Sequence, residues 1–246
     1  MQLSQKLKEK IKKNLTIALV ICALISSTLA TFKLADFSIN SDNTMYATTL
    51  AETGDEADSY TTTRLENTDT ITYIYDAADL VAFRNAVNAG NSYAGKTVYL
   101  MADIDMSTVC SESLGTWVPI GVSGSYFVGR FDGNYHTISN LYINTNKYRY
   151  AGLFYINKST SIIQNLMLED INIYNYYNTN HSYTGGIISV NYGTILNCAT
   201  ISGSIKSSET IIGTSTNTII CGAGGIAGSN LGTINSCYNS ANVKAT

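Results

Sequence analysis

Apolar residues between positions 70 and 246 occur in pairs or at every second position, and Gly, Asn and Ser interrupt them at short intervals. Alternation of this kind, with many β-branched residues, is typical of short β-strands. Asn and Gly suit the corners between such strands, because both adopt positive φ at low cost. The pattern therefore predicts an all-β domain over residues 70–246.

One stretch near the start of this domain has the period of a helix instead. Leu80, Phe83 and Val87 fall on one helical face, Asp76 is a suitable N-cap, and Gly90 ends the stretch. A stack of strands exposes an open edge at its end, which invites pairing with other chains unless something covers it. We expect this short helix to be the N-terminal cap of the stack.

A glycine-rich phrase occurs twice, 39 residues apart. Residues 185–198 read GGIISVNYGTILNC and residues 224–237 read GGIAGSNLGTINSC. A looser copy begins at Gly152, and the phrase Ile-x-x-(Leu or Cys) starts at four positions, Ile138, Ile163, Ile195 and Ile234. A fixed period of this kind indicates stacked structural repeats.

A period of about 34–39 residues suits one propeller blade, one helical hairpin or about two rungs of a β-solenoid. The composition argues against helical hairpins, and propeller blades need longer strands and more repeats. A right-handed parallel β-helix fits best, with Ile, Leu, Val and Cys pointing inward. On this interpretation Cys198 and Cys237 lie two rungs apart.

The repeated phrase resembles the GLUG-motif repeats of bacterial surface proteins. The likeness covers residues 70–246 and includes FVGRFDGNYHTISNL at residues 127–141. The resemblance implies a right-handed parallel β-helix on an exported protein, most often of Gram-positive bacteria. Members of that family include adhesin-like proteins and non-catalytic regions of IgA-specific metallopeptidases, and the motif carries no known catalytic residue.

The N-terminus has the physical features of a secretion signal. Five lysines precede an apolar run over residues 15–25, and small residues follow up to Ala30. We expect residues 1–30 to be a signal peptide cleaved after Ala30, with an uncleaved signal anchor as the alternative. Residues 31–69 are rich in Thr, Ser, Asp and Asn, which predicts a flexible linker. The last repeat ends near Thr246 without a cap-like segment, so we expect the solenoid to be incomplete there.

Charge and cysteine content narrow the function. The signal segment holds five of the 15 basic and one of the 18 acidic residues, so the rest of the chain has a net charge near −7 (10 basic, 17 acidic). This charge argues against nucleic-acid binding. Four cysteines remain, Cys110, Cys198, Cys221 and Cys237. At two rungs, about 10 Å, Cys198 and Cys237 are too far apart for a disulfide, which predicts buried free thiols.

Catalytic motifs are absent from the sequence. His136 and His181 are the only histidines, and neither belongs to a His-Glu-x-x-His motif. Polysaccharide lyases also use parallel β-helices, with acidic calcium ligands and a basic proton abstractor. The nearest such set comprises Asp103, Asp105, Arg130, Asp132 and His136. Turn and surface roles explain these residues at least as well, because Asp-Gly-Asn is itself a turn signal. We expect no metal and no cofactor.

Tyrosine is the most suggestive surface residue. The chain has 18, and Tyr174, Tyr176, Tyr177 and Tyr183 surround a variable segment between repeats. A tyrosine ring offers apolar area with a polar tip, which suits sugars and protein surfaces. These four residues are the predicted ligand-binding surface; an aromatic ladder that stabilises loops is the alternative.

We therefore expect a secreted or cell-surface β-solenoid that acts as a non-catalytic adhesion or interaction module. Its expected partners are glycans or host and cell-surface proteins, with no nucleic acid and with membrane contact only through the signal segment. The alternatives are a lyase-like polysaccharide-active enzyme on the same scaffold, and a passive spacer in a larger surface protein.

Overall fold

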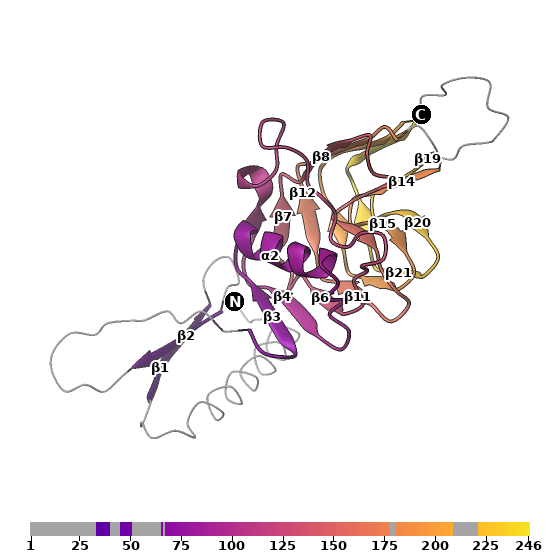
Figure 1. Ribbon diagram of the computed structural model, residues 1–246. Helices are drawn as coiled ribbons and strands as arrows, with labels where there is room; N and C mark the ends of the chain where they lie inside the picture. The colour runs from indigo at the N-terminus through magenta and orange to yellow at the C-terminus, as the bar shows by residue number, and fades with distance from the viewer. Residues whose placement is uncertain (1–32, 40–44, 51–64, 66, 178–180, 209–220) are drawn as a thin grey trace, which may run out of the picture. The chain divides into compact units, whose positions relative to one another are not determined.

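The computed structural model describes residues 33–39, 45–50, 65, 67–177, 181–208 and 221–246 (Figure 1). The predicted signal peptide, residues 1–30, lies outside them. The chain divides into two compact units, Met1–Leu65 and Glu66–Thr246. In the part of the chain that the structure describes, no helix has the length and apolar character needed to cross a membrane.

The described part of the first unit is a pair of strands. Strands β1 (Lys33–Ile39) and β2 (Met45–Leu50) pair antiparallel, from Lys33 opposite Leu50 to Ile39 opposite Met45. These strands fall within residues 31–69, for which the sequence predicts a flexible linker. Both strands contain residues of high β-propensity, such as Phe, Ile, Tyr and Thr.

The second unit is a parallel β-solenoid, as predicted. Its strands form five ladders that run along the stack, and every pairing between named strands in them is parallel. A complete coil contributes one strand to each ladder, so strands that are neighbours in space come from successive coils.

Two ladders extend to the N-terminal end of the stack. The first contains β3 (Ile71–Ile74), β4 (Thr97–Leu100), β6 (Arg130–Asp132), β11 (Ile162–Gln164), β16 (Thr194–Leu196) and β21 (Thr233–Asn235). The second contains β5 (Ile104–Asp105), β7 (Thr137–Ser139), β12 (Met167–Glu169), β17 (Ala199–Thr200) and β22 (Tyr238–Asn239). A short 3-10 helix, η1 (Met106–Thr108), follows β5.

The other three ladders complete each coil. The third contains β8 (Tyr142–Thr145), β13 (Ile171–Asn175), β18 (Gly203–Ser207) and β23 (Asn242–Ala245). The fourth contains β9 (Tyr150–Ala151), β14 (Ser182–Gly185) and β19 (Cys221–Gly224). The fifth contains β10 (Phe154–Ile156), β15 (Ile188–Asn191) and β20 (Ala227–Asn230).

The 39-residue period is one coil, so the prediction of two rungs was wrong. Ile163 pairs with Ile195, and Ile195 pairs with Ile234, in adjacent strands of the first ladder. A complete coil contains five strands, one for each ladder, and therefore needs more residues than the rung assumed in the prediction. The repeated phrases themselves keep the predicted register at these three positions.

The fourth predicted copy of the Ile phrase, Ile138, lies in a different ladder. Ile138 pairs with Ile104 and Leu168 in the second ladder, whereas Phe131 occupies the position below Ile163. The error has a local cause: in the coil of β11, β12 and β13, two consecutive corners use the same backbone conformation, at Asn165 and Asp170. Asn165, Asn197 and Ser236 have φ near 52° at one corner. Asn140 and Asp170 have φ of 58° and 50° at the next, so the sequence signals of both corners look alike.

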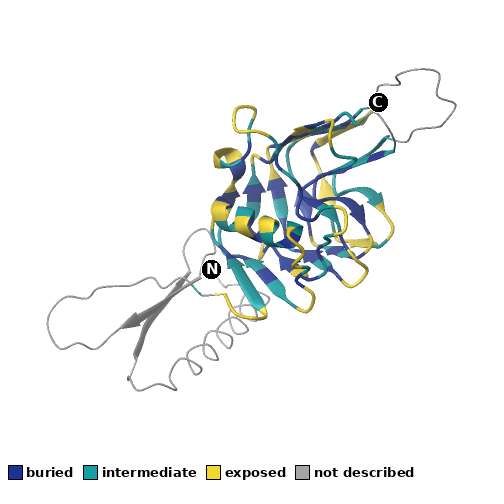
Figure 2. Ribbon diagram, in the orientation of Figure 1, coloured by how far each residue is buried: buried dark blue, intermediate teal, exposed yellow. Residues whose placement is uncertain are grey.

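Helix α2 (Ala77–Asn88) caps the N-terminal end, as predicted (Figure 1). The Asp76 carboxylate accepts a hydrogen bond from the Asp79 backbone N–H (2.9 Å). The buried ring of Phe83 packs against Phe127 and Phe131, with ring centroids 5.7 and 5.8 Å apart. Figure 2 shows buried residues along many strands of the stack, and both buried and exposed residues along α2.

The coil at the other end is exposed. Ile234 and Val243 hold the positions that Ile195 and Ile205 hold one coil below. Ile195 and Ile205 are 0% exposed, but Ile234 is 37% and Val243 is 39% exposed. Among the described residues no strand pairs with the outer edge of β20–β23. Among the residues that the structure describes, the apolar positions of this coil are therefore uncovered.

Candidate functional site

The four tyrosines predicted as a binding surface lie in two separate groups. Tyr174 and Tyr176 form one pair, with ring centroids 5.1 Å apart. The Tyr174 hydroxyl accepts a hydrogen bond from Ser208 Oγ (3.1 Å), and Lys206 Nζ lies 4.6 Å from the centre of the Tyr174 ring. The ring pair lies within one segment of the chain, and the contacts of Tyr174 with Lys206 and Ser208 join β13 to β18 and the residue that follows it. Tyr177 follows the same strand and is half-buried.

Tyr183 belongs to a longer row of rings. It stacks on Tyr150 at a centroid distance of 6.0 Å and an interplanar angle of 8°. Tyr150 meets Tyr155 edge to face at 5.0 Å, and Tyr155 stacks with Tyr126 at 6.4 Å. We call Tyr126, Tyr155, Tyr150 and Tyr183 the tyrosine strip. All four side chains are partly exposed, so the strip is an aromatic surface across the fourth and fifth ladders.

Strand register produces the strip. Tyr150 pairs with Tyr183 in the fourth ladder, and Tyr183 pairs with Gly222 in the next coil. A Cβ atom at position 222 would lie 2.9 Å from the Cδ1 atom of Tyr183. Glycine at position 222 therefore leaves this side of the Tyr183 ring free of a side chain from β19.

Two cations lie over the strip. Lys158 Nζ is 4.1 Å from the ring centre of Tyr126, and Arg149 Cζ is 5.1 Å from that of Tyr150. Arg149 Nε also donates a hydrogen bond to the His181 carbonyl oxygen (2.6 Å), which fixes the guanidinium beside the rings. Cation–π contacts of this kind stabilise exposed rings by about 0.5–1 kcal/mol. The strip is thus both aromatic and positively charged.

Two hydroxyls of the strip, those of Tyr155 and Tyr150, stay protonated near neutral pH. Burial is the main cause that raises the pKa of Tyr155 to about 12, and neighbouring Tyr150 and Tyr126 raise it further. Burial also raises the pKa of Tyr150, although Arg149 opposes the shift. A neutral phenol both donates and accepts hydrogen bonds, which suits the hydroxyl groups of a carbohydrate.

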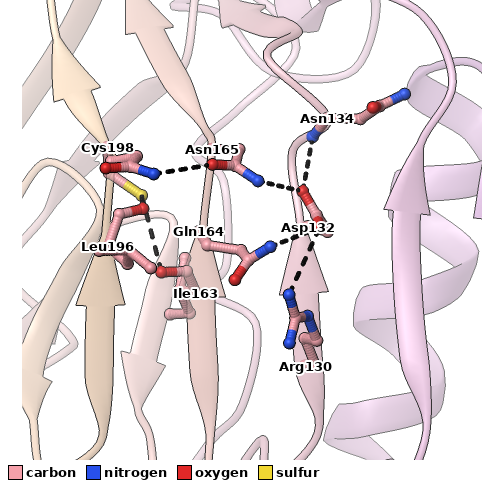
Figure 3. Close-up of polar contacts among 9 residues, drawn as sticks. Arg130, Asp132, Asn134, Ile163, Gln164, Asn165, Leu196 and Cys198 are labelled. Carbon is pink, nitrogen blue, oxygen red and sulfur yellow. Dashed lines mark hydrogen bonds and ion pairs between the residues drawn. The ribbon is translucent and has the colours of Figure 1, made fainter. Parts of the chain in front are cut away.

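The residues considered for lyase chemistry have structural contacts. Asp132 is 9% exposed, and its carboxylate accepts hydrogen bonds from Gln164 Nε2 (2.5 Å), Asn165 Nδ2 (2.9 Å) and the Asn134 backbone N–H (3.0 Å) (Figure 3). Arg130 Nη2 lies 3.9 Å from the same carboxylate. Asp132 thus fastens a corner of its own coil to the next coil.

The remaining lyase candidates also bond to neighbouring coils. Asp103 Oδ1 lies 3.1 Å from His136 Nδ1 and accepts a hydrogen bond from the Thr137 N–H (2.8 Å). Asp105 accepts from the Asn140 side chain (2.8 Å), and its hydrogen bonds lower its pKa. Among the residues that the structure describes, no three His, Cys, Asp or Glu side chains form a group able to hold a metal ion.

Cys198 and Cys237 lie in adjacent coils, which overturns the predicted two-rung separation. Residues on either side of them pair directly, Leu196 with Asn235 and Ala199 with Tyr238. The Cys198 backbone N–H donates to Cys237 Sγ at 3.3 Å. No disulfide joins the cysteines that the structure describes; Cys110 and Cys198 are buried, whereas Cys221 and Cys237 are only half-buried.

Comparison with known proteins gives two related sequences. The chain is 33% identical over 141 residues to Halomucin of Haloquadratum walsbyi, a match that covers 55% of this chain and 1% of that protein. It is 30% identical over 95 residues to a protein named putative Gly-rich membrane protein in Evansella cellulosilytica, covering 39% of this chain and 10% of that protein. The chain therefore matches a small part of two much longer proteins.

Two other comparisons give no match. No family model matches the chain. No solved structure matches it. The likeness to GLUG-motif repeats therefore rests on the residues quoted above.

Sequence reasoning missed how the strip is assembled. Tyr126 lies in a loop before β6, outside the repeat, and no sequence pattern connects it with Tyr155. Tyr150 and Tyr183 carry a recognisable signal, because they occupy equivalent outward positions in successive coils, 33 residues apart. Reading coils of the correct length would have paired them.

Proposed function

We propose that this chain is a surface-associated, non-catalytic β-solenoid that binds polysaccharide through the tyrosine strip. The observation that carries the proposal is the row of four partly exposed rings, Tyr126, Tyr155, Tyr150 and Tyr183, held by strand register. Flat rings with polar tips offer stacking area to sugar faces and hydrogen bonds to their hydroxyls. The repeated residues pack inside the solenoid, so we assign binding to residues that point outward.

The cations of the strip favour an acidic glycan. Arg149 and Lys158 lie over its rings, and each can attract a carboxylate or sulfate group on a bound chain. The names of the two relatives, a mucin-like name and a membrane-protein name, support a location at the cell surface. The GLUG-like repeats support the same location, and secretion through residues 1–30 remains part of the proposal.

Non-catalytic action is supported by the contacts of the lyase candidates. Asp132 accepts hydrogen bonds from three groups in the turn and the next coil, and Asp103 is engaged by His136 and Thr137. A proton abstractor must instead reach the substrate. Arg130 Nη2 lies 3.9 Å from the Asp132 carboxylate.

Binding is tested by calorimetric titration of the purified chain with polygalacturonate and with a neutral glucan. We expect binding, tighter for polygalacturonate and weakened by salt. Tyr183→Ala should weaken it by about fivefold to tenfold, since one aromatic contact contributes about 1–1.5 kcal/mol. Tyr174→Ala, in the other tyrosine pair, is the matched control and should bind as the parent does.

Two results would contradict the proposal. Equal losses of affinity in Tyr183→Ala and Tyr174→Ala would show that binding does not depend on the tyrosine strip. Release of unsaturated products from polygalacturonate, abolished by Arg130→Ala, would make the chain an enzyme of the lyase class instead.

A further inference from the structure

The two cysteines of the repeated phrase form one column of the solenoid wall. Cys198 and Cys237 occupy the same place in successive coils, between the paired residues Leu196 and Asn235 on one side and Ala199 and Tyr238 on the other. One coil lower, Leu166 takes this place, because Met167 pairs with Ala199. A pair of thiols therefore exists only between these two coils among those that the structure describes.

Backbone spacing in this column suits a disulfide. Neighbouring strands in a sheet lie about 4.7–4.9 Å apart. Disulfides join residues whose Cα atoms are about 4.4–6.8 Å apart. The backbone of the two coils therefore needs little movement for the sulfur atoms to bond.

Side-chain orientation brings the sulfur atoms together. Each thiol points to the carbonyl oxygen two residues earlier, at 3.4 Å for Cys198 and 3.2 Å for Cys237. Cys237 Sγ also lies 3.3 Å from the Cys198 backbone nitrogen and 3.8 Å from the Ile195 carbonyl oxygen. The Cys237 thiol thus leans into the coil below, where the Cys198 thiol lies beside the Ile163 and Leu196 carbonyls (Figure 3).

We propose that Cys198 and Cys237 form a disulfide that fastens two successive coils when the protein meets a small-molecule disulfide as oxidant. The proposal rests on the stacking of the two residues and does not depend on glycan binding.

The two thiols differ in a way that sets the order of reaction. Cys237 is half-buried, whereas Cys198 is 1% exposed. A hydrogen bond from the Cys198 thiol lowers the pKa of Cys237 to about 6, and the same bond, with burial, raises the pKa of Cys198. Cys237 therefore supplies the thiolate, which is the attacking form in thiol–disulfide exchange.

The exchange proceeds in two steps that balance. The Cys237 thiolate attacks one sulfur of the external disulfide, forms a mixed disulfide and releases one small thiolate. Cys198 then loses its proton, attacks the Cys237 sulfur and releases the second small thiol. Two protein thiols are oxidised by two electrons to one disulfide, and the external disulfide is reduced to two thiols, which take up the two protons.

Peptide mapping of the full chain tests the linkage. The purified protein is incubated with oxidised glutathione, free thiols are alkylated, and a tryptic digest is analysed by mass spectrometry. Cleavage at Lys158, Lys206 and Lys244 places Cys198 in peptide 159–206, and Cys221 with Cys237 in peptide 207–244. We expect these two peptides to be joined, with a loss of about two mass units from the intact protein, and to separate on reduction.

Matched variants identify the partner cysteine. Cys221→Ser should still form the link, whereas Cys237→Ser should not. Oxidation of the parent should raise its melting temperature by roughly 5–10 °C, because the link closes a long loop. The proposal fails if both peptides stay unlinked and fully alkylated after oxidation, or if the link survives in Cys237→Ser. Because the mapping uses the unaltered chain, it gives an answer even if a variant does not fold.

Discussion

Individual side chains join successive coils through an asparagine ladder inside the solenoid. Asn157 Nδ2 donates to Asn191 Oδ1 at 2.8 Å, and Asn191 Nδ2 donates to Asn230 Oδ1 at 2.8 Å. Asn157 Oδ1 also accepts the backbone N–H of Tyr192 (2.7 Å). Asn157 and Asn191 are 0% exposed, so the ladder satisfies polar groups that water does not reach. Each Asn thus fixes the corner of its coil and the register with the next coil.

Replacing the central member of the ladder should destabilise the protein strongly. Asn191→Ala removes the acceptor of the buried Asn157 amide and one of the two acceptors of the Gly193 backbone N–H. We expect the free energy of unfolding to fall by about 2–4 kcal/mol. Urea denaturation followed by circular dichroism measures the change. The control is Asn172→Ala, at an exposed position of β13, with an expected change within about 0.5 kcal/mol. Similar urea midpoints for the two variants would show that the ladder adds little to stability.

At the scale of elements, glycine pairs let successive coils approach closely. Gly186 lies beside the backbone of Gly225 in the next coil, and its N–H donates to the Gly224 carbonyl oxygen at 3.2 Å. A Cβ atom at position 186 would overlap the Gly225 carbonyl oxygen and contact Thr200 Oγ1. Glycine is required here by contact between two backbones, not by an unusual φ angle.

Gly186→Ala should therefore strain the contact between β14–β15 and β19–β20. The neighbour of the new methyl group is backbone, so the two coils must separate locally, at a cost of about 1–3 kcal/mol. Thermal melting measures this cost. Ser204→Ala, at an exposed position of β18, is the control and should melt within a few degrees of the parent. A melting temperature of Gly186→Ala equal to that of the control would contradict this account of the glycine pairs.

The elements also show where sequence reasoning succeeds and where it stops. Helix α2 and its N-cap are predictable from the sequence because their signals are local. These signals are Asp76 and the apolar stripe of Leu80, Phe83 and Val87. The sequence assigns Ile138 to the wrong ladder, because two consecutive corners both have a residue with positive φ and similar sequences. The tyrosine strip was only partly found, since ring contacts such as Tyr126 with Tyr155 depend on which loop folds over which coil.

At the scale of the whole molecule, the solenoid is a stack in which each coil contacts its neighbours. Ala199 pairs with Tyr238, its equivalent in the next coil. Removal of residues 199–237 therefore joins Cys198 directly to Tyr238, which can take the place of Ala199. Stability in such arrays is approximately a sum over repeats and their interfaces. The cut removes one coil of the stack and leaves the lower coils intact.

Deletion of residues 199–237 should consequently give a folded protein with the strand content of a shorter stack. Circular dichroism and size-exclusion chromatography check this expectation. The matched control deletes residues 199–218, which is about half a coil and joins strands from different ladders; we expect it to unfold or aggregate. Unfolding of the full-coil deletion would contradict the assignment of one coil to 39 residues.

Differences in coil length are concentrated at one corner, between the third and fourth ladders. The number of residues that separates two paired positions in the sequence measures the local coil length. At this corner it rises from 30 (Tyr142 with Asn172) to 33 (Tyr150 with Tyr183). In the next coil it rises from 32 (Ile171 with Gly203) to 39 (Ser182 with Cys221). Proteins with this fold can thus gain or change residues at this corner while the residues that fill the interior stay the same. Diversity among descendants should accumulate along that edge, which makes it a natural place to graft foreign peptides for display.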